Sequence, residues 1–477
     1  MPKFASLPAH HAHHAHHTHH ALPAASLAVG ATSSEAMAAN ADLADHLSAL
    51  PQTRAKASPR PRKRAQRSPQ PLVTPRAHHC RRGRPPFFRN SECLACQTPL
   101  GYWPEQQNLL PLQDAGEGRW QAWGSDPTDV RFARCANLHT AAACNWLVTG
   151  VTDAGWQQLC RCCRLTRTVP DLTLAEHPLW WNRIEVAKRR LESALIGLGL
   201  PVEGRDENPT GGMAFDLLRT APGAANVVTG HADGVITLDV EEADDAWRKR
   251  RRTALAEPYR TLLGHLRHET GHYYWQRMVD GSAWLPDFRA LFGDEQADYA
   301  AALQQHHERG APAEWRSRHV SAYASCHTWE DWAETSAHYL HLRDTLDTAR
   351  SFGIDGDRME LSYERFGVDA LPVAGAGAVA VSGADMDAGA GASAGASTGL
   401  GQGQSRRLSK SRSPTQDEQF LNPINSSMQL TGVLNELSRS MGVADFYPFV
   451  LSRPTIGKLH LLHRVVTERS QPSGVAP

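Results

Sequence analysis

Cysteine spacing constrains the fold of this chain more than any other feature. Eight of the nine cysteines fall between Cys80 and Cys163. Repeated short cysteine knuckles are typical of a zinc ribbon, because each knuckle turn presents two thiolates to one tetrahedral ion. A site closed by four thiolates has no open coordination position, so it holds the fold rather than doing chemistry. We predict one such structural site, formed by Cys135, Cys144, Cys160 and Cys163, with Cys162 as the alternative to Cys163.

A second structural zinc site is predicted nearby, but it is incomplete. Its three cysteines are Cys80, Cys93 and Cys96. Gly83 stands where the knuckle that begins at Cys80 would place its second cysteine. Either His78 or His79 completes this site, or the site is degraded. Disulfides would explain the cysteines only in an oxidising compartment, and the first residues, "MPKFASLPAHH", carry no apolar export signal.

Two long segments lack the apolar periodicity that a folded core requires. Residues 1–76 begin with "HHAHHAHHTHH" after a short lead and end in a basic, proline-rich run, and residues 373–416 are rich in Gly, Ala and Ser. Such compositions cannot offset the entropy of ordering, so we expect a disordered tail and a disordered insertion. Residues 417–470 are again apolar with helical spacing, which indicates a loop inserted into one domain.

The charge balance argues against a nucleic-acid partner. Lys plus Arg and Asp plus Glu both number 50, so the formal net charge is zero. No apolar stretch reaches the roughly 18 residues that a membrane span needs. We expect a cytoplasmic protein without membrane contact, and an acid-poor tail leaves a transit peptide as the alternative. The sequence indicates no oligomeric state.

A second metal-binding pattern lies in the stretch "LLGHLRHETGHYYWQRMV", residues 262–279. Apolar residues recur along it at helical spacing. His268 and His272 are four residues apart, so on a helix both imidazoles face one ion. Glu269 would flank that ion as a general base, which is the H-E-x-x-H arrangement of zinc hydrolases.

The third ligand is expected in "TWEDWAETSAHYLH", residues 328–341. We predict a helix capped by Thr328, on which Glu330 and Glu334 share one face. Carboxylates on so apolar a helix are costly unless a cation meets them. Glu330 is assigned as the ligand, and Glu334 as the acceptor of a hydrogen bond from a ligating imidazole. The reverse assignment stays open.

Tyr323, in the loop before this helix, is the candidate donor to a developing oxyanion. The alternative is that Tyr323 is only a packed aromatic residue. Cys326 and His327 beside it are assigned no role.

With these residues the sequence resembles the gluzincin metallopeptidases, and more closely a bacterial family described as "putative zinc-binding metallopeptidase" with an N-terminal zinc ribbon. The resembling segments include "CLACQTPLGYWPE", "LCRCCRLTRTVPDL", "HLRHETGHYYW" and "WEDWAETSAHYLH". Tyr323 precedes Glu330 by seven residues, which is similar to the lethal factor type of gluzincin and supports Glu330 as the ligand. The missing cysteine at Gly83, the long insertion and the His-rich tail depart from the family.

The resemblance implies an α+β fold, with a mostly helical zincin-like domain and a small sheet beside the histidine helix. We expect the zinc ribbon at 77–172 and the metallopeptidase domain at 173–372 and 417–470. In zincins an edge strand pairs with extended substrate, so the strand predicted at 230–240 is the candidate for substrate docking. An interior strand without substrate contact is the alternative.

The expected function is hydrolysis of a peptide or protein substrate. Zinc lowers the pKa of a bound water, Glu269 accepts its proton, and Tyr323 stabilises the oxyanion. A rival reading makes the chain a zinc-ribbon adaptor that binds protein or nucleic acid, with a non-catalytic second metal site. Three protein ligands favour the enzyme, since structural sites prefer four.

Overall fold

The computed structural model describes residues 74–470, apart from residues 127, 150, 153–154, 157, 221–226, 255–256, 258, 360, 362 and 373–414. The chain divides into two units, 1–70 and 71–477, and all described residues belong to the second. Most of the predicted tail and insertion therefore lies outside the described residues. Within the described part, none of the helices has the length and apolar character to cross a membrane.

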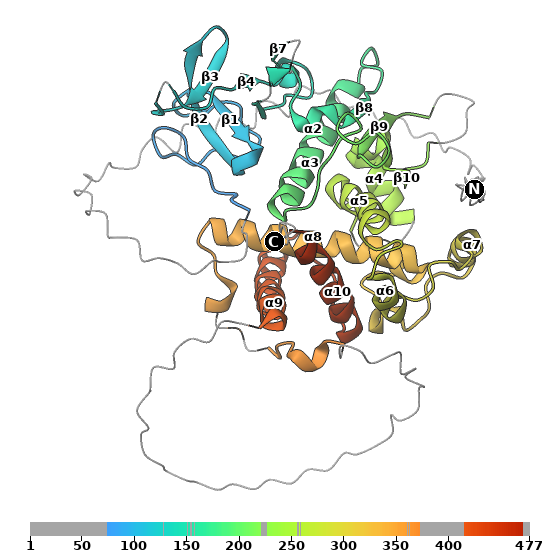
Figure 1. Ribbon diagram of the computed structural model, residues 1–477. Helices are drawn as coiled ribbons and strands as arrows, with labels where there is room; N and C mark the ends of the chain where they lie inside the picture. The colour runs from blue at the N-terminus through green and yellow to red at the C-terminus, as the bar shows by residue number, and fades with distance from the viewer. Residues whose placement is uncertain are drawn as a thin grey trace, which may run out of the picture. The chain divides into compact units, whose positions relative to one another are not determined.

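Short strands and turns make up the N-terminal part of the described chain (Figure 1). A three-stranded antiparallel sheet has the order β1-β2-β3, and two further pairs, β4-β5 and β6-β7, flank it. The bounds are β1 Leu100–Trp103, β2 Asn108–Gly116, β3 Arg119–Ala122, β4 Ala133–Arg134, β5 Leu147–Val148, β6 Val151–Thr152 and β7 Gly155–Trp156. Cysteines are the largest group among the buried residues of this part, and a core of this size usually needs a metal or a staple to be stable.

A four-stranded mixed sheet follows, with the order β10-β11-β9-β8. Its strands are β8 Thr166–Thr168, β9 Ala214–Leu218, β10 Gly230–Ala232 and β11 Val235–Asp239. β11 runs parallel to β9, and β10 returns antiparallel to β11. The alternation of Ile236 and Leu238 buries one face of β11 in the main core.

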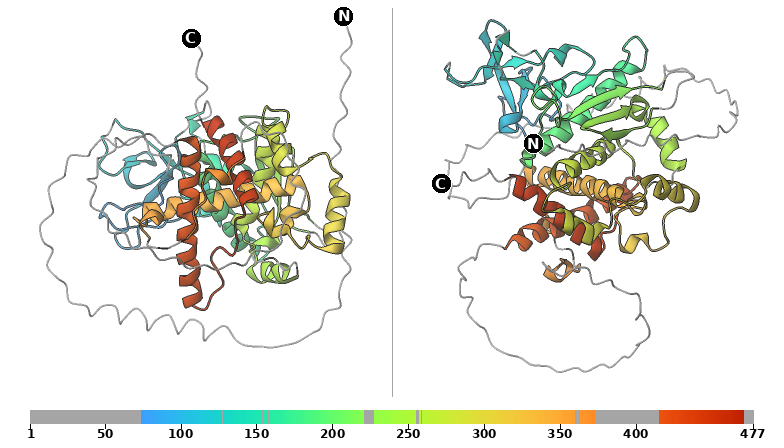
Figure 2. Two further views of the ribbon diagram at one scale, coloured as in Figure 1. Left: turned by 90° about the horizontal axis from the view of Figure 1, so that it is seen from below. Right: turned by 45° about the vertical axis from the view of Figure 1, so that its right-hand side comes forward.

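Helices form the rest of the described chain. They are α2 Arg161–Arg164, α3 His177–Gly197, α4 Asp245–Ala254, α5 Leu262–Met278, α6 Leu285–Phe292, α7 Tyr299–Arg309, α8 Thr328–Ser351, α9 Gln416–Ser440 and α10 Arg453–Ser470. α8 packs against α5 on one side and against α9 and α10 on the other (Figures 1 and 2). This mixture of helices and small sheets confirms the predicted α+β class.

The closest helix packing occurs where α5 crosses α8. A Cβ atom added at Gly271 would lie 3.0 Å from Ala333 Cα and 3.0 Å from Ser336 Cβ. Trp332 Nε1 donates a hydrogen bond of 3.1 Å to the Gly271 carbonyl. Glycine is therefore needed at this position because the α8 backbone approaches it directly.

A buried ionic cluster joins the N-terminal part to these helices. Asp344 on α8 accepts from Arg76 Nε (3.0 Å), from Arg190 Nε of α3 (2.7 Å) and from Arg267 Nη2 of α5 (2.7 Å). Burial would raise the pKa of the Asp344 carboxyl, but the three guanidinium groups hold it well below its usual range. Thr74 and Arg76, which fall in the predicted tail, are thus buried parts of the folded unit.

Candidate functional site

Three metal-binding side chains converge at the crossing of α5 and α8. His268 and His272 lie on α5 and Glu330 on α8, and all three are buried. His268 Nε2 is 3.2 Å from His272 Nε2, and Glu330 Oε2 is 3.0 Å and 3.6 Å from these two nitrogens. One ligand atom from each residue lies within 4.8 Å of the others. The structure therefore brings together the three residues predicted to hold the catalytic metal.

The donor set at this site fits a divalent cation. Glu330 Oε2 is buried and receives no hydrogen bond, although two imidazole nitrogens face it. A buried carboxylate oxygen without a partner is costly unless a positive charge meets it. Two imidazoles and one carboxylate are ligands that zinc accepts, and three protein ligands leave one position open.

The electrostatics of Glu330 reflect this arrangement. Burial would raise the pKa of its carboxyl, but the neighbouring His272 and His268 hold that pKa well below its usual range. Glu330 is therefore ionised at neutral pH and presents a negative charge to the two imidazoles.

Glu334 lies one helical turn beyond Glu330 and contacts the other nitrogen of His268. Its Oε1 is 2.7 Å from His268 Nδ1, and its Oε2 accepts a hydrogen bond of 2.6 Å from Ser321 Oγ. Burial would raise the pKa of Glu334, but His268 and its other partners lower it to about 2. An ionised Glu334 fixes the proton of His268 on Nδ1 and leaves Nε2 free to bind a metal.

Two tyrosines lie against the carboxylate. Tyr299, the first residue of α7, donates a hydrogen bond of 2.7 Å to Glu330 Oε1. The ring centroid of Tyr323 lies 6.0 Å from that of His268. Burial and the charge of Glu330 raise the pKa of Tyr323 well above its usual value, so its hydroxyl remains a donor. Nothing in the sequence indicated Tyr299 or Ser321, because both reach the site through tertiary packing.

Glu269 is buried on α5, between the two histidines in sequence. Its negative charge is the smallest of the named effects that raise the pKa of Tyr323, after burial and the charge of Glu330. The candidate base thus lies next to one of the three clustered residues in the sequence of α5.

The predicted cap of α8 is wrong by one residue. His327 is the N-cap, and its Nδ1 accepts from the Trp329 backbone N–H at 3.1 Å. Thr328 is already helical, and its hydroxyl donates to the Asp294 carbonyl instead. His327, which was assigned no role, competes successfully because its ring can also satisfy a backbone N–H.

The strand predicted within 230–240 is present as β11, Val235–Asp239, and it is the interior strand of the alternative rather than the expected edge strand. These residues form the hairpin β10–β11, turned at Asp233 and Gly234, which both have positive φ. The alternating residues belong to β11, which is interior between β10 and β9. Only the three residues of β10, 230–232, lie at the sheet edge, and they pack against α5.

The first cysteine group lies at the start of α2. Cys135, Cys144, Cys160 and Cys163 are buried, with sulfur atoms all within 4.8 Å of one another. The backbone N–H groups of Cys160 and Cys163 point to sulfur atoms of the same group at 3.4 Å, which stabilises thiolates. Cys162 is buried outside this group, and burial raises the pKa of its thiol well above the usual value.

The second cysteine group has three members among the described residues. Cys80, Cys93 and Cys96 have sulfur atoms within 4.8 Å of one another. Neither His78 nor His79 joins this group. Thr98 Oγ1 lies 3.1 Å from Cys96 Sγ, and this hydrogen bond is the largest of the effects that lower the pKa of the Cys96 thiol to about 6.

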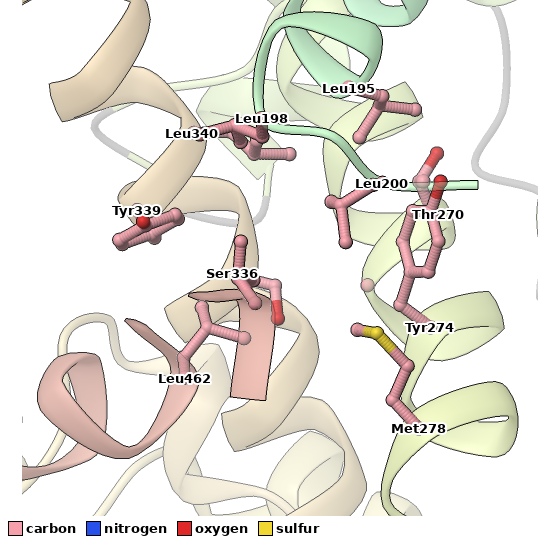
Figure 3. Close-up of a pocket in the computed structure, with 12 residues that line it drawn as sticks. Leu195, Leu198, Leu200, Thr270, Tyr274, Met278, Ser336, Tyr339, Leu340 and Leu462 are labelled. Atoms are coloured by element: carbon pink, nitrogen blue, oxygen red, sulfur yellow. The ribbon is translucent and has the colours of Figure 1, made fainter. Parts of the chain in front are cut away.

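A small cavity lies beside α5, on the face that carries Thr270 and Tyr274 (Figure 3). Its volume is about 20 Å³, and apolar side chains of α3, α5, α8 and α10 line most of it. Thr270 and Tyr274 face this cavity, whereas the ligating histidines are two positions away along the helix and point to the other side. The cavity belongs to the packing of the helices and is too small for a substrate.

Comparison with known proteins identifies the family. Residues 177–465 match the family described as "Putative zinc-binding metallo-peptidase", and residues 77–174 match a zinc-ribbon domain. The chain belongs to this metallo-peptidase family. Family membership and the ribbon's cysteine groups support zinc as the metal of this chain.

Relatives of this chain occur in mycobacteria. "Uncharacterized protein Mb2598c" of Mycobacterium bovis and "Uncharacterized protein Rv2568c" of Mycobacterium tuberculosis are each 39% identical to it over 395 residues. The match covers 82% of this chain and 96% of each relative. No solved structure matches the chain significantly.

Proposed function

We propose that this chain is a zinc-dependent peptidase that hydrolyses peptide bonds without a covalent intermediate. The observation that carries the proposal is the buried triad His268, His272 and Glu330, whose ligand atoms lie within 4.8 Å of one another. Three protein ligands, rather than the four of a structural site, leave one coordination position for water. Zinc held there supplies a Lewis acid that lowers the pKa of this water toward neutrality.

Glu269 is the proposed general base. It follows His268 directly on α5, is buried, and does not belong to the ligand group. We infer that its carboxylate flanks the metal position. Glu269 accepts the proton of the attacking water and passes it to the departing amide nitrogen.

Tyr323 is the proposed oxyanion donor. Its raised pKa keeps the phenol protonated at neutral pH. Its hydroxyl would donate to the oxyanion when substrate binds. Tyr299 remains bound to Glu330 throughout, which keeps Glu330 Oε2 directed at the metal position.

β10 is the proposed docking strand for an extended substrate. It lies at the edge of the mixed sheet and packs against α5, the helix with the two histidines. An edge strand offers unpaired backbone groups to a peptide that lies alongside it. A peptide or protein substrate is thus compatible with the geometry beside the triad.

The rival function is a zinc-ribbon adaptor whose histidine site is structural. Among the described residues the triad supplies three metal ligands rather than four, and Glu269 follows His268 without joining the ligand group. Both features favour a catalytic site over a closed structural site. The nine cysteines form no disulfide, which supports our inference of a reducing cytoplasmic compartment.

Two substitutions test the proposal. Glu269→Gln is expected to retain one catalytic zinc per chain and to lose hydrolysis of a peptide library by at least about 100-fold, the lower range for a general base. Glu330→Ala is expected to lose that zinc as well. Glu436→Gln, an exposed substitution on α9, is the control that changes neither property. Retained hydrolysis in Glu269→Gln would remove Glu269 from the base role, and unchanged metal content in Glu330→Ala would refute the ligand set.

A further inference from the structure

The three-cysteine group of the ribbon is built like one side of a zinc site. Cys93 and Cys96 form a complete knuckle, in which the backbone N–H of Gln97 donates to the Cys93 carbonyl at 2.7 Å. Cys80 reaches the same point from the preceding turn, and its sulfur lies 3.6 Å from Cys96 Sγ. Three sulfurs held this close in a reduced chain favour a thiophilic cation such as zinc.

The described residues supply no ligand for the fourth coordination position of this group. Gly83 occupies the place of the missing cysteine, is exposed with φ of +73°, and a Cβ atom added there would meet nothing within 4 Å. His78 does not replace that cysteine, because none of its ligand atoms lies within the group, and its Nδ1 contacts Asn108 Oδ1 (3.1 Å) and the Leu109 backbone N–H (3.2 Å). His79 is exposed and also lies outside the group.

The turn that follows Cys80, next to the unfilled coordination position, is cationic. Arg81, Arg82 and Arg84 all belong to the turn after Cys80, and all are exposed. Zinc with three thiolates carries one net negative charge, and these guanidinium groups offset it. An additional anionic ligand is therefore favourable here, and a thiolate is the anion that such a zinc site prefers.

We propose that Cys80, Cys93 and Cys96 hold a zinc ion whose fourth ligand is a thiolate from outside the chain. This site differs from the closed group around Cys135, which supplies all four thiolates itself. Its zinc exchanges faster than the zinc of the closed group, because one coordination position becomes open whenever the outside thiolate dissociates. The proposal does not depend on the peptidase function.

Cobalt substitution of the full-length chain tests this proposal. Thiolate-to-cobalt charge transfer absorbs in the near ultraviolet and grows with the number of bound thiolates. Cys96→Ser is expected to bind one ion fewer than the wild type. The absorbance that Cys96→Ser loses relative to the wild type comes from the three thiolates of this site. Free cysteine added to the wild type supplies a fourth thiolate, so it is expected to raise the absorbance by about one third of that loss.

Thiol binding at the histidine triad occurs equally in the wild type and in Cys96→Ser, so the difference between them reports the three-cysteine site alone. Cys80→Ser gives the same test if Cys96→Ser does not fold. Equal metal content in wild type and variants, or an equal response to thiol, overturns the proposal.

A second arm of the experiment separates the two sources of the thiolate. A short acidic peptide with one cysteine is compared with its serine counterpart and with free cysteine. Saturation by the peptide at a concentration at least about tenfold lower than by free cysteine identifies another polypeptide as the source, since each tenfold corresponds to 1.4 kcal/mol of contacts beyond the sulfur. Equal saturation identifies a small soluble thiol. No response to any thiol overturns the proposal.

Discussion

Replacing Tyr299 by phenylalanine is expected to weaken zinc binding without removing any metal ligand. The Tyr299 hydroxyl donates to Glu330 Oε1 at 2.7 Å, and Glu330 Oε2 faces the two histidines. Without the hydroxyl, the Glu330 carboxylate can rotate and offer either oxygen, so the site loses its fixed geometry. The ring itself fits unchanged, because Phe differs only by the hydroxyl.

The magnitude follows from the type of hydrogen bond. A hydrogen bond to a charged group contributes about 1.5–3 kcal/mol when its partner is left buried and unsatisfied. With 1.4 kcal/mol per tenfold, this predicts that the zinc Kd of Tyr299→Phe rises about 10- to 100-fold, which is the range found for groups that orient metal ligands.

Competition with a chromophoric chelator measures this Kd. Tyr363→Phe is the matched control, because its hydroxyl donates to the Asn425 carbonyl beside α9, away from the triad. A Kd within twofold of the wild type in Tyr299→Phe would refute the argument that this hydroxyl orients Glu330. A loss of equal size in the control would assign the effect to general destabilisation.

Three further predictions concern stability. Asp344→Asn leaves the buried Arg267 without its counter-charge, and we expect a loss of about 3–5 kcal/mol in urea unfolding, with less than 1 kcal/mol contradicting the assignment. Gly271→Val forces the α8 backbone at Ala333 away, so it should cost about 1–3 kcal/mol and also weaken zinc binding; unchanged zinc binding would show that the crossing adjusts without moving the site. Burial would raise the pKa of Glu242, but neighbouring cations lower it to about 2, so its contribution is complete above pH 4.5 and is lost as pH falls toward 2. In Glu242→Gln the melting temperature should fall less steeply as pH is lowered from 4.5 toward 2, and an unchanged pH dependence would contradict this.

The features that the sequence predicted correctly are local in the chain. The α5 helix follows from apolar spacing, and the helical spacing of His268 and His272 puts both on one face without any tertiary information. Family membership was likewise predictable, because the resembling motifs are short and carry their own chemistry. The α+β class followed from the same patterns.

The features that sequence reasoning missed are decided by tertiary packing. Tyr299 reaches Glu330 only because α7 folds back over the start of α8, and no periodicity encodes that approach. The hairpin at Asp233 was missed because a non-glycine residue with positive φ turns the chain there, and a glycine follows it. At the start of α8, two residues could cap the helix, and tertiary contacts of Thr328 decided between them.

The choice between Glu330 and Glu334 shows where the limit lies. Both carboxylates share one face of α8, one turn or about 5.4 Å apart, so spacing alone cannot assign them. The bond from Trp332 Nε1 to the Gly271 carbonyl fixes α8 along α5, and this register puts Glu330 at the Nε2 side of His268 and Glu334 at its Nδ1 side.

The two positions therefore predict unequal effects on zinc binding. Glu330→Gln removes a ligand charge and should abolish the zinc of the triad, whereas Glu334→Gln still presents an oxygen to Nδ1 and should raise the zinc Kd about 10- to 100-fold. Zinc content and Kd of the two variants, measured side by side, decide the matter. If Glu334→Gln loses the metal and Glu330→Gln keeps it, Glu334 is the ligand, and the register of α8 along α5 differs by one turn from the one that this structure shows.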